Sequence, residues 1–348
     1  MGRRPAARLG EGGQRLNRIL CAIPESTYAR IMTPKLEARL RALCDVTFCP
    51  RPGELSDTEY GSLWAQADAV LTGWGVRPPT EAQAAAATRL KVVAHSAGTV
   101  RMLPRSLIER GVVVTSARAA IARTVAEHAL MSTLALLRRM PAFVGDERCR
   151  AYYLRGADRP ESETLYGKTI GIVGLGCVGR LFLNLIAPFA CRVLVFDPAL
   201  PEEAVRAGGG EPVGLERLLR ESKVVSLHAP DIPATRGLIG ARELAWMPDG
   251  AVLVNTARGR LVDTEALTAE AATGRLLIAI DVTEPEPLPA EHPLRSMPNV
   301  LWTPHIAGPT TDDLPHLART AIDDLERCLR GEPPLYPIGL REYDLMSF

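Results

Sequence analysis

The amino-acid sequence predicts an α/β protein with two doubly wound parallel sheets in tandem. Short apolar runs alternate with helical patterns along most of the chain, and such alternation is typical of parallel sheets. The chain has 348 residues, whereas single hydrophobic cores stop growing at about 250–300 residues. Because the alternation breaks off after residue 140 and resumes at Thr169, we expect two domains with about six strands each.

The first series of elements begins with a strand close to the N-terminus. Thr33 and Pro34 follow it in the order that favours a helix start, because threonine caps free N–H groups and proline fits the first turn. We expect strands at 19–23, 46–48, 69–71, 92–94 and 112–114. We expect helices at 34–43, 57–66, 80–88 and 104–110. A longer apolar stretch, 121–140, predicts a helix that ends at Pro141.

The second series leads to a final helix at 312–330 and a proline-rich tail. We expect its strands at 169–173, 192–196, 224–228, 251–255, 277–280 and 300–303. The irregular stretch 148–164 predicts a loop or an arm that contacts a second subunit. The expected organisation is a flexible tail (1–16), a substrate domain (17–120 with 305–348) and a cofactor domain (121–304).

The composition argues against several classes of partner. The formal net charge is +1, which gives no general attraction for nucleic acid or an anionic membrane. The apolar run at 19–23 is far too short for a membrane span or a secretion signal. Cys44 and Cys49 have no further Cys or His nearby to complete a zinc site, so we expect no metal. The scattered thiols favour a reducing compartment, the cytoplasm.

A glycine-rich turn joins the strand at 169–173 to a helix. Gly174 permits the tight turn, Gly176 lets the backbone touch a pyrophosphate, and Gly179 lets the helix pack closely on the strand. Val178 lies in the same turn, at the helix N-terminus that faces the phosphates. The next strand ends in Asp197, whose carboxylate accepts hydrogen bonds from a ribose and repels a 2′-phosphate. The pattern therefore predicts a dinucleotide site for NAD rather than NADP.

Three later strand ends carry residues suited to acid–base chemistry. An imidazole such as that of His305 has an ordinary pKa of about 6.5, close to working pH. A carboxylate would orient that imidazole, and chemistry alone leaves Glu284 and Glu286 as alternatives. Arg258 offers a fork of donors for a substrate carboxylate and a polarised carbonyl oxygen.

These motifs, in this order after the glycine turn, resemble those of the D-isomer-specific 2-hydroxyacid dehydrogenases. The resemblance is specific in residues 167–308 and looser in the N-terminal third. It implies a flavodoxin-like substrate domain, a Rossmann NAD-binding domain, a small 2-oxo or 2-hydroxy acid substrate and a homodimer. It also implies that Arg258, Glu286 and His305 form the catalytic set.

The resemblance assigns further residues to the cofactor. It implies that Asp281, at a strand end, hydrogen-bonds the nicotinamide carboxamide. The remaining residues assigned to the cofactor site are His228, Pro230, Thr235 and Ala257.

On the substrate side, the resemblance implies that the small residues Ala97 and Gly98 bind the substrate carboxylate through backbone N–H groups. Many relatives carry Asp where this chain has Val100, so a relative's substrate does not transfer directly. Trp74, in another strand-end loop, either covers the substrate side chain or packs against the protein. His128 is expected to have a structural role.

Two alternatives remain open from the sequence. Corepressors that share the fold and keep the catalytic residues bind dinucleotides as sensors, and a fold does not decide function. Other relatives oxidise formate or phosphite, which are small acids of a different kind.

Overall fold

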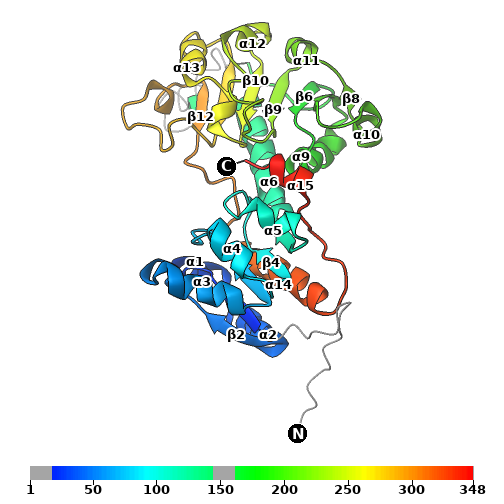
Figure 1. Ribbon diagram of the computed structural model, residues 1–348. Helices are drawn as coiled ribbons and strands as arrows, with labels where there is room; N and C mark the ends of the chain where they lie inside the picture. The colour runs from blue at the N-terminus through cyan, green and yellow to red at the C-terminus, as the bar shows by residue number, and fades with distance from the viewer. Residues whose placement is uncertain (1–17, 144–160, 348) are drawn as a thin grey trace. The chain divides into compact units, whose positions relative to one another are not determined.

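The chain divides into two compact units in the computed structural model, which describes residues 18–143 and 161–347 (Figure 1). The split unit contains the chain up to Ile121 and the chain from Pro309 onward, and the central unit contains Ala122–Gly308. By this division His305 lies in the central unit rather than beyond its boundary. The predicted tail, 1–16, and most of the predicted arm, 148–164, lie outside the described residues.

The split unit is built on a five-stranded parallel sheet in the order β2-β1-β3-β4-β5. This is the flavodoxin-like order, so the predicted fold of this part is confirmed. The strands are β1 (Arg18–Cys21), β2 (Asp45–Phe48), β3 (Ala69–Thr72), β4 (Val92–His95) and β5 (Val113–Ser116).

The central unit is built on a seven-stranded parallel sheet in the order β12-β11-β10-β9-β6-β7-β8. When the strands of this unit are numbered from 1 in chain order, the sheet read from β8 to β12 has the order 3-2-1-4-5-6-7. This is the Rossmann order 3-2-1-4-5-6 with one more strand at the edge. The strands are β6 (Thr169–Val173), β7 (Arg192–Phe196), β8 (Glu211–Pro212), β9 (Val224–Leu227), β10 (Val252–Asn255), β11 (Leu277–Ile280) and β12 (Val300–Trp302).

The described residues form five strands in one sheet and seven in the other, close to the expected number of about six in each domain. The additional strand, β8, has two residues. Such a short strand gives no alternation of polar and apolar residues that a sequence pattern can reveal.

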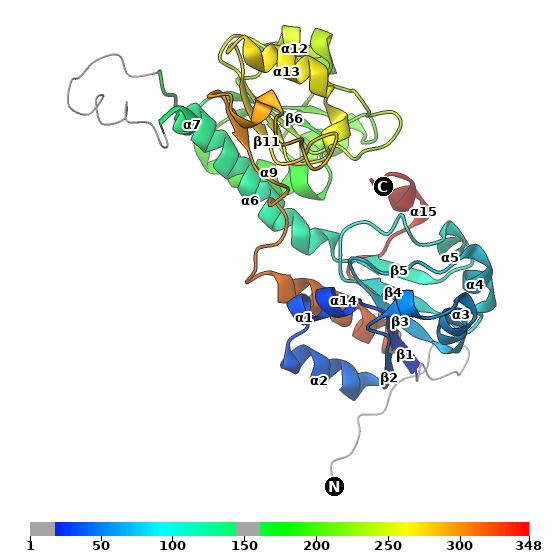
Figure 2. The same cartoon turned by 90° about the vertical axis from the view of Figure 1, so that its left-hand side faces the viewer.

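Helices cover both faces of each sheet because successive strand residues point to opposite faces. In the split unit, Leu20 faces one apolar cluster, whereas Ile19 and Cys21 face another. Figure 2 shows α1, α2 and α14 on one side of this sheet and α3, α4 and α5 on the other. These helices are α1 (Glu25–Ile31), α2 (Pro34–Leu43), α3 (Asp57–Gln66), α4 (Glu81–Ala86), α5 (Arg105–Glu109) and α14 (Leu314–Leu329).

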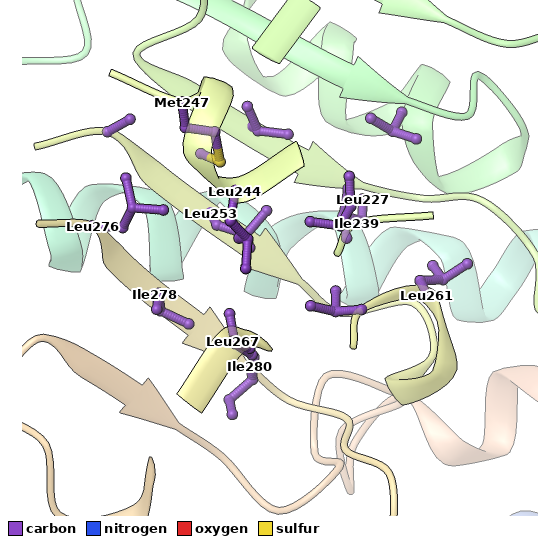
Figure 3. Packing of buried hydrophobic residues seen from close by; sticks show 14 of the residues in the cluster. Leu227, Ile239, Leu244, Met247, Leu253, Leu261, Leu267, Leu276, Ile278 and Ile280 are labelled. Atoms are coloured by element: carbon purple, nitrogen blue, oxygen red, sulfur yellow. The ribbon is translucent and has the colours of Figure 1, made fainter. Parts of the chain in front are cut away.

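The same alternation fills the core of the central unit. Leu253 faces the cluster under α11, α12 and α13, and Val252 and Val254 face the cluster under α6 and α9. Figure 3 shows Leu244, Leu267 and their neighbours packed on the first of these faces. The helices are α6 (Arg118–Leu137), α7 (Met140–Phe143), α9 (Cys177–Ile186), α10 (Glu202–Ala207), α11 (Leu215–Glu221), α12 (Ala241–Trp246) and α13 (Thr264–Ala272).

The helices differ from the prediction at two places along the chain. The long helix ends at Leu137, not at Pro141, because Arg139 adopts a left-handed conformation with φ 57° and Pro141 lies inside α7. The proline-rich tail contains a helix that the sequence pattern did not reveal, α15 (Leu340–Asp344). Tyr343 and Met346 bury their side chains in the core of the split unit, and this tertiary packing supports a helix too short to show a sequence period.

The helix start at Pro34 is confirmed, and the Thr33 hydroxyl accepts the N–H of Leu36 at 3.3 Å. No helix within 18–143 or 161–347 has the length and apolar run needed to cross a membrane. Over the same residues, no cluster of His, Cys, Asp and Glu has the geometry to hold a metal ion.

Candidate active site

The glycine turn after β6 is shaped by close backbone contacts. Gly174 has φ 92°, and a Cβ there would lie 2.7 Å from the backbone nitrogen of Ala229. A Cβ on Gly179 would overlap the carbonyl oxygen of Gly174. At Gly176, by contrast, no atom lies within 4 Å of a Cβ position. Two of the glycines are therefore needed for packing, and the third leaves open space at the N-terminus of α9, where a pyrophosphate fits.

Asp197, at the end of β7, ties this turn to the neighbouring strand. Its Oδ2 accepts the N–H of Leu175 at 2.8 Å, and its Oδ1 accepts the N–H of Ala199 at 2.9 Å. Each carboxylate oxygen keeps a second lone pair for another donor. The carboxylate can therefore orient the glycine turn and still accept hydrogen bonds from a ribose.

The loop after β9 lies beside the same turn. The N–H of His228 donates to the carbonyl oxygen of Val173 at 2.7 Å, and its Nε2 lies 3.0 Å from the hydroxyl of Ser226. Burial lowers the pKa of His228 to about 3, so the ring is neutral and unsuited to give a proton near neutral pH. The Thr235 hydroxyl donates to the carbonyl oxygen of Pro230 and so closes the loop. Val178 lies in the first turn of α9.

Arg258 follows β10 in a loop that Asn255 holds. The Asn255 side chain donates to the carbonyl oxygen of Arg258 at 2.9 Å and accepts the N–H of Ala257 at 3.1 Å. A Cβ on Gly259 would overlap the backbone of Thr283. The loops after β10 and β11 consequently touch, and this contact requires glycine.

The Arg258 guanidinium makes one hydrogen bond to a described residue, from Nη1 to the carbonyl oxygen of Ala257 at 2.7 Å. It forms no ion pair with any side chain within 18–143 or 161–347. Burial lowers its pKa, an effect that the negative charges of Glu286 and Asp231 oppose. A partly buried guanidinium without a carboxylate partner has the charge and free donors that suit an anion.

His305 and Glu286 come from the loops after β12 and β11 and hydrogen-bond each other through Nδ1 and Oε1. The side chains remain 49% and 41% exposed, so both are accessible to a substrate. Glu284 instead pairs with Arg260, with its Oε2 3.0 Å from Nε. Chemistry alone left open whether Glu284 or Glu286 pairs with His305, and the geometry shows Glu286 as the partner.

Asp281, at the end of β11, organises the backbone around His305. Its buried carboxylate accepts the Thr303 hydroxyl at 2.7 Å and the N–H groups of Ile306 at 2.8 Å and Ala307 at 2.9 Å. The N–H of His305 donates to the carbonyl oxygen of Asp281 at 2.8 Å. These contacts hold His305 in a left-handed conformation with φ 54°. Nε2 of His128 lies 3.3 Å from the Thr303 hydroxyl, which places this histidine beside the same cluster.

An open pocket of about 270 Å³ adjoins these groups. Its walls include Asp281, Glu286 and His305 together with the ring of Trp302. The pocket thus lies at the carboxyl ends of β11 and β12, the edge where parallel sheets bind ligands.

The predicted substrate residues lie in the split unit. Ala97 and Gly98 follow β4, and the Ser116 hydroxyl contacts the carbonyl oxygens of both. In the described part of the chain, no hydrogen bond uses the N–H groups of residues 97–100. Trp74 is partly buried and packs on the core of the split unit, while its carbonyl oxygen accepts the Thr27 hydroxyl at 3.1 Å.

Several residues that support the site were not predicted from the sequence. Asp231, directly after Pro230, is buried and pairs with Arg236 at 2.8 Å. The feature of the sequence that could have pointed to Asp231 is its position in the loop that follows a predicted strand. The contacts of Asn255 and Thr303 depend on side-chain orientation, which a sequence pattern does not contain.

Most of the chain is similar to known proteins of one enzyme family. The family model "D-isomer specific 2-hydroxyacid dehydrogenase, NAD binding domain" matches residues 130–307. A D-3-phosphoglycerate dehydrogenase of Mycobacterium tuberculosis is 35% identical over 273 residues, which are 77% of this chain and 50% of the relative. A glyoxylate reductase of Korarchaeum cryptofilum is 34% identical over 254 residues, 72% of this chain and 76% of the relative.

The chain spans about half the length of the D-3-phosphoglycerate dehydrogenases that it matches. Among solved structures, D-mandelate dehydrogenase of Rhodotorula graminis aligns with a TM-score of 0.77 at 24% identity, covering 93% of this chain and 98% of the other. This likeness supports the fold. The match to an NAD-binding domain supports NAD as the cofactor.

Proposed function

This chain belongs to the D-isomer-specific 2-hydroxyacid dehydrogenases, and on that premise we propose that it is an NAD-dependent oxidoreductase that interconverts a 2-hydroxy acid and a 2-oxo acid. The observation that carries the proposal is Arg258. A partly buried guanidinium without a carboxylate partner lies in the same unit as a His–carboxylate pair. An anion-binding cation and an acid–base imidazole are the two groups that reduction of an oxo acid requires.

The cofactor site fits NAD. The open space at Gly176 and the N-terminus of α9 would receive the pyrophosphate, and Asp197 would bind the ribose. By family resemblance, His228, Pro230, Thr235 and Ala257 line the rest of the cofactor site, and Asp281 binds the carboxamide. When bound, the reduced nicotinamide supplies a hydride for the C2 carbon of the substrate.

His305 handles the proton in this proposal. Glu286 holds Nδ1, which leaves Nε2 to give a proton to the oxygen on C2 during reduction and to take it back during oxidation. Arg258 polarises that oxygen and stabilises its negative charge. Asp281 is a positioning residue, because its carboxylate fixes the turn that carries His305.

The substrate class is small 2-oxo and 2-hydroxy acids. We assign the carboxylate to the N–H groups of Ala97 and Gly98, whose carbonyl oxygens are held by Ser116. Trp74 is the candidate to cover the substrate side chain. The relatives named as D-3-phosphoglycerate dehydrogenase and glyoxylate reductase suggest where a search for the substrate should begin.

NADH oxidation tests the proposal directly. The panel consists of glyoxylate, hydroxypyruvate, 3-phosphohydroxypyruvate, pyruvate, and branched and aromatic 2-oxo acids, with NAD reduction by formate and phosphite measured in parallel. We expect turnover with at least one 2-oxo acid. Tight NADH binding without turnover of any acid would instead identify a dinucleotide sensor.

We also propose that the protein is a homodimer of the cytoplasm. Exposed apolar side chains on the central unit, among them Met131, Met140, Tyr166 and Leu185, support an interface there. Cys21, Cys49, Cys177, Cys191 and Cys328 have free thiols, which fits a reducing compartment. Sedimentation equilibrium should give twice the chain mass, and a monomer at micromolar concentration would contradict the dimer.

A further inference from the structure

The loop after β4 combines restrained carbonyl groups with free N–H groups. The Ser116 hydroxyl binds the carbonyl oxygens of Ala97 and Gly98, and the N–H groups of residues 97–100 make no hydrogen bond to the described residues. Such a loop binds an anion only if its peptide planes stay in place before the anion arrives. Ser116 restrains one end of the loop, and the other end needs a second restraint.

The C-terminal segment reaches this loop after crossing the edge of the sheet at β5. The N–H of Ile338 donates to the carbonyl oxygen of Val114 at 2.8 Å, and Pro337 forms an antiparallel bridge with Thr115. Upstream, the buried carboxylate of Asp324 on α14 accepts the N–H groups of residues 335 and 336 at 2.6 and 3.2 Å. The segment is therefore fixed along its course before α15 begins.

Beyond that edge, the segment holds the loop at two positions. The Tyr343 hydroxyl donates to the carbonyl oxygen of Leu103 at 2.7 Å, and the Thr99 hydroxyl donates to the carbonyl oxygen of Ser347 at 2.7 Å. Tyr343 is only 6% exposed, so its hydrogen bond is shielded from water. These contacts restrain the end of the loop that Ser116 does not reach.

Arg101 takes part in the same arrangement. Its guanidinium lies 4.7 Å from the centre of the Tyr343 ring, and Nη1 lies 3.8 Å from the Asp344 carboxylate. The cation next to Val100 is therefore directed to the C-terminal helix. The Arg101 guanidinium thus has a structural role as a contact of α15, and we do not assign it to substrate binding.

We infer that residues 336–347, the C-terminal brace, are a working part of the substrate site, and that Thr99 and Tyr343 are positioning residues that hold the loop ready for a carboxylate. The inference rests on the proposed function in one respect, namely that the anion is the carboxylate of a 2-oxo acid. The brace acts by preorganisation: the hydrogen bonds that it makes keep the free N–H groups together without touching the substrate.

The test uses the full chain with single hydroxyl deletions. Tyr343→Phe and Thr99→Val each remove one hydroxyl group with the two hydrogen bonds that it makes, and Thr99→Ser keeps a hydroxyl at the same position. Tyr28→Phe is the matched control, because its hydroxyl contacts Glu37 at 2.8 Å elsewhere in the same unit. Amide hydrogen exchange at residues 97–103 is measured first, since it is independent of turnover.

We expect exchange of these amides to rise about fivefold in Tyr343→Phe and Thr99→Val, the effect of about one net hydrogen bond. The rise should be absent in Tyr28→Phe and in Thr99→Ser. Unchanged exchange in both deletion variants would overturn the brace, whether or not the wild type turns over any acid.

Kinetics then separate the brace from the proposed function. The KM for the preferred 2-oxo acid should rise about fivefold in the two deletion variants, while kcat and the Kd for NADH stay within about twofold. Faster exchange with an unchanged KM would overturn the role of the brace in substrate binding. A wild type that binds NADH but reduces no 2-oxo acid contradicts the proposed function, while the exchange result still decides the brace.

Discussion

Arg258 and His305 are positioned by different means. His305 is held by side chains, through Glu286 on its ring and Asp281 beneath its backbone. Arg258 is held by its own loop, which Asn255 closes, and its guanidinium has no carboxylate partner among the described residues. The imidazole is thus oriented by a side chain, whereas the Arg258 guanidinium makes a single hydrogen bond within the described part of the chain, to the carbonyl oxygen of Ala257.

Removal of the Arg258 guanidinium should weaken the binding of the transition state. We expect Arg258→Ala to lower kcat/KM at least about hundredfold, because a buried charged partner of the substrate is lost at about 3 kcal/mol. Arg260→Ala is the matched control, since Arg260 is exposed and pairs with Glu284. Steady-state kinetics with the preferred 2-oxo acid measure both. Equal effects of the two substitutions would contradict the catalytic assignment of Arg258.

Asp197 should decide between NAD and NADP. Asp197→Asn keeps an acceptor for the N–H of Leu175 but removes the negative charge that repels a 2′-phosphate. We expect the preference for NADH over NADPH, measured as the ratio of kcat/KM values, to fall at least about tenfold. An unchanged ratio would show that the carboxylate serves only the turn.

For single residues, the sequence predicted the chemical type of the site residues better than the contacts that they make. Glu284 and Glu286 have the same chemistry and lie two positions apart, so only the course of the loop assigns one to Arg260 and the other to His305. Asp231 was missed for a related reason. Its burial depends on the packing of neighbouring loops, which no local pattern records.

Among the elements, the loops after β10 and β11 support each other through Gly259. A Cβ there would overlap the backbone of Thr283, and backbone cannot move aside as a flexible side chain can. The loops that carry Arg258 and Glu286 are therefore coupled by one glycine.

Gly259→Ala should consequently reduce both stability and activity. We expect a loss of about 2 kcal/mol in the free energy of unfolding, typical of overpacking, together with a lower kcat. Gly53→Ala is the control, because a Cβ on Gly53 meets no atom within 4 Å. Urea unfolding and steady-state kinetics check both variants, and a fully active, fully stable Gly259→Ala protein would refute the coupling.

Elements with a repeated pattern were predictable, and those fixed by tertiary contacts were not. The strand runs and the cap at Thr33 follow from local physical chemistry. The two-residue β8 and the five-residue α15 are too short to show a period. The end of α6 at Leu137 follows from the backbone turn at Arg139, a conformation that its residue type does not favour.

For the whole molecule, each unit contains a histidine, at or directly after the end of a strand, whose ring is kept neutral by desolvation. Burial lowers the pKa of His95 in the split unit to about 4 and that of His228 in the central unit to about 3. In the unfolded chain both titrate near about 6.5. Between these values the unfolded chain binds more protons, so folding stability is complete above about pH 6.5 and falls as the pH drops towards 4.

The free energy of unfolding should therefore decrease between pH 7 and pH 5 by about 2 kcal/mol for each of these histidines. His228→Gln keeps a partner for the Ser226 hydroxyl but cannot be protonated, so its stability should depend less on pH. Urea unfolding at both pH values measures the difference. The same pH dependence in wild type and variant would contradict a neutral, buried His228.

The alternating elements predicted two doubly wound parallel sheets, and the resemblance to a known family supplied the flavodoxin-like and Rossmann strand orders. The substrate was not predictable, because Val100 and Arg101 replace a familiar pattern and the C-terminal segment that contacts this loop follows no motif.

The most direct test of hydride transfer from NADH to a 2-oxo acid is to follow the hydride with an isotope label. NADH deuterated at the transferable position of the nicotinamide is incubated with the preferred 2-oxo acid, and the product is analysed by mass spectrometry and chiral chromatography. We expect a D-2-hydroxy acid that carries one deuterium at C2, and no deuterated product above background from His305→Gln. Oxidation of NADH without deuterium in a 2-hydroxy acid would contradict this expectation.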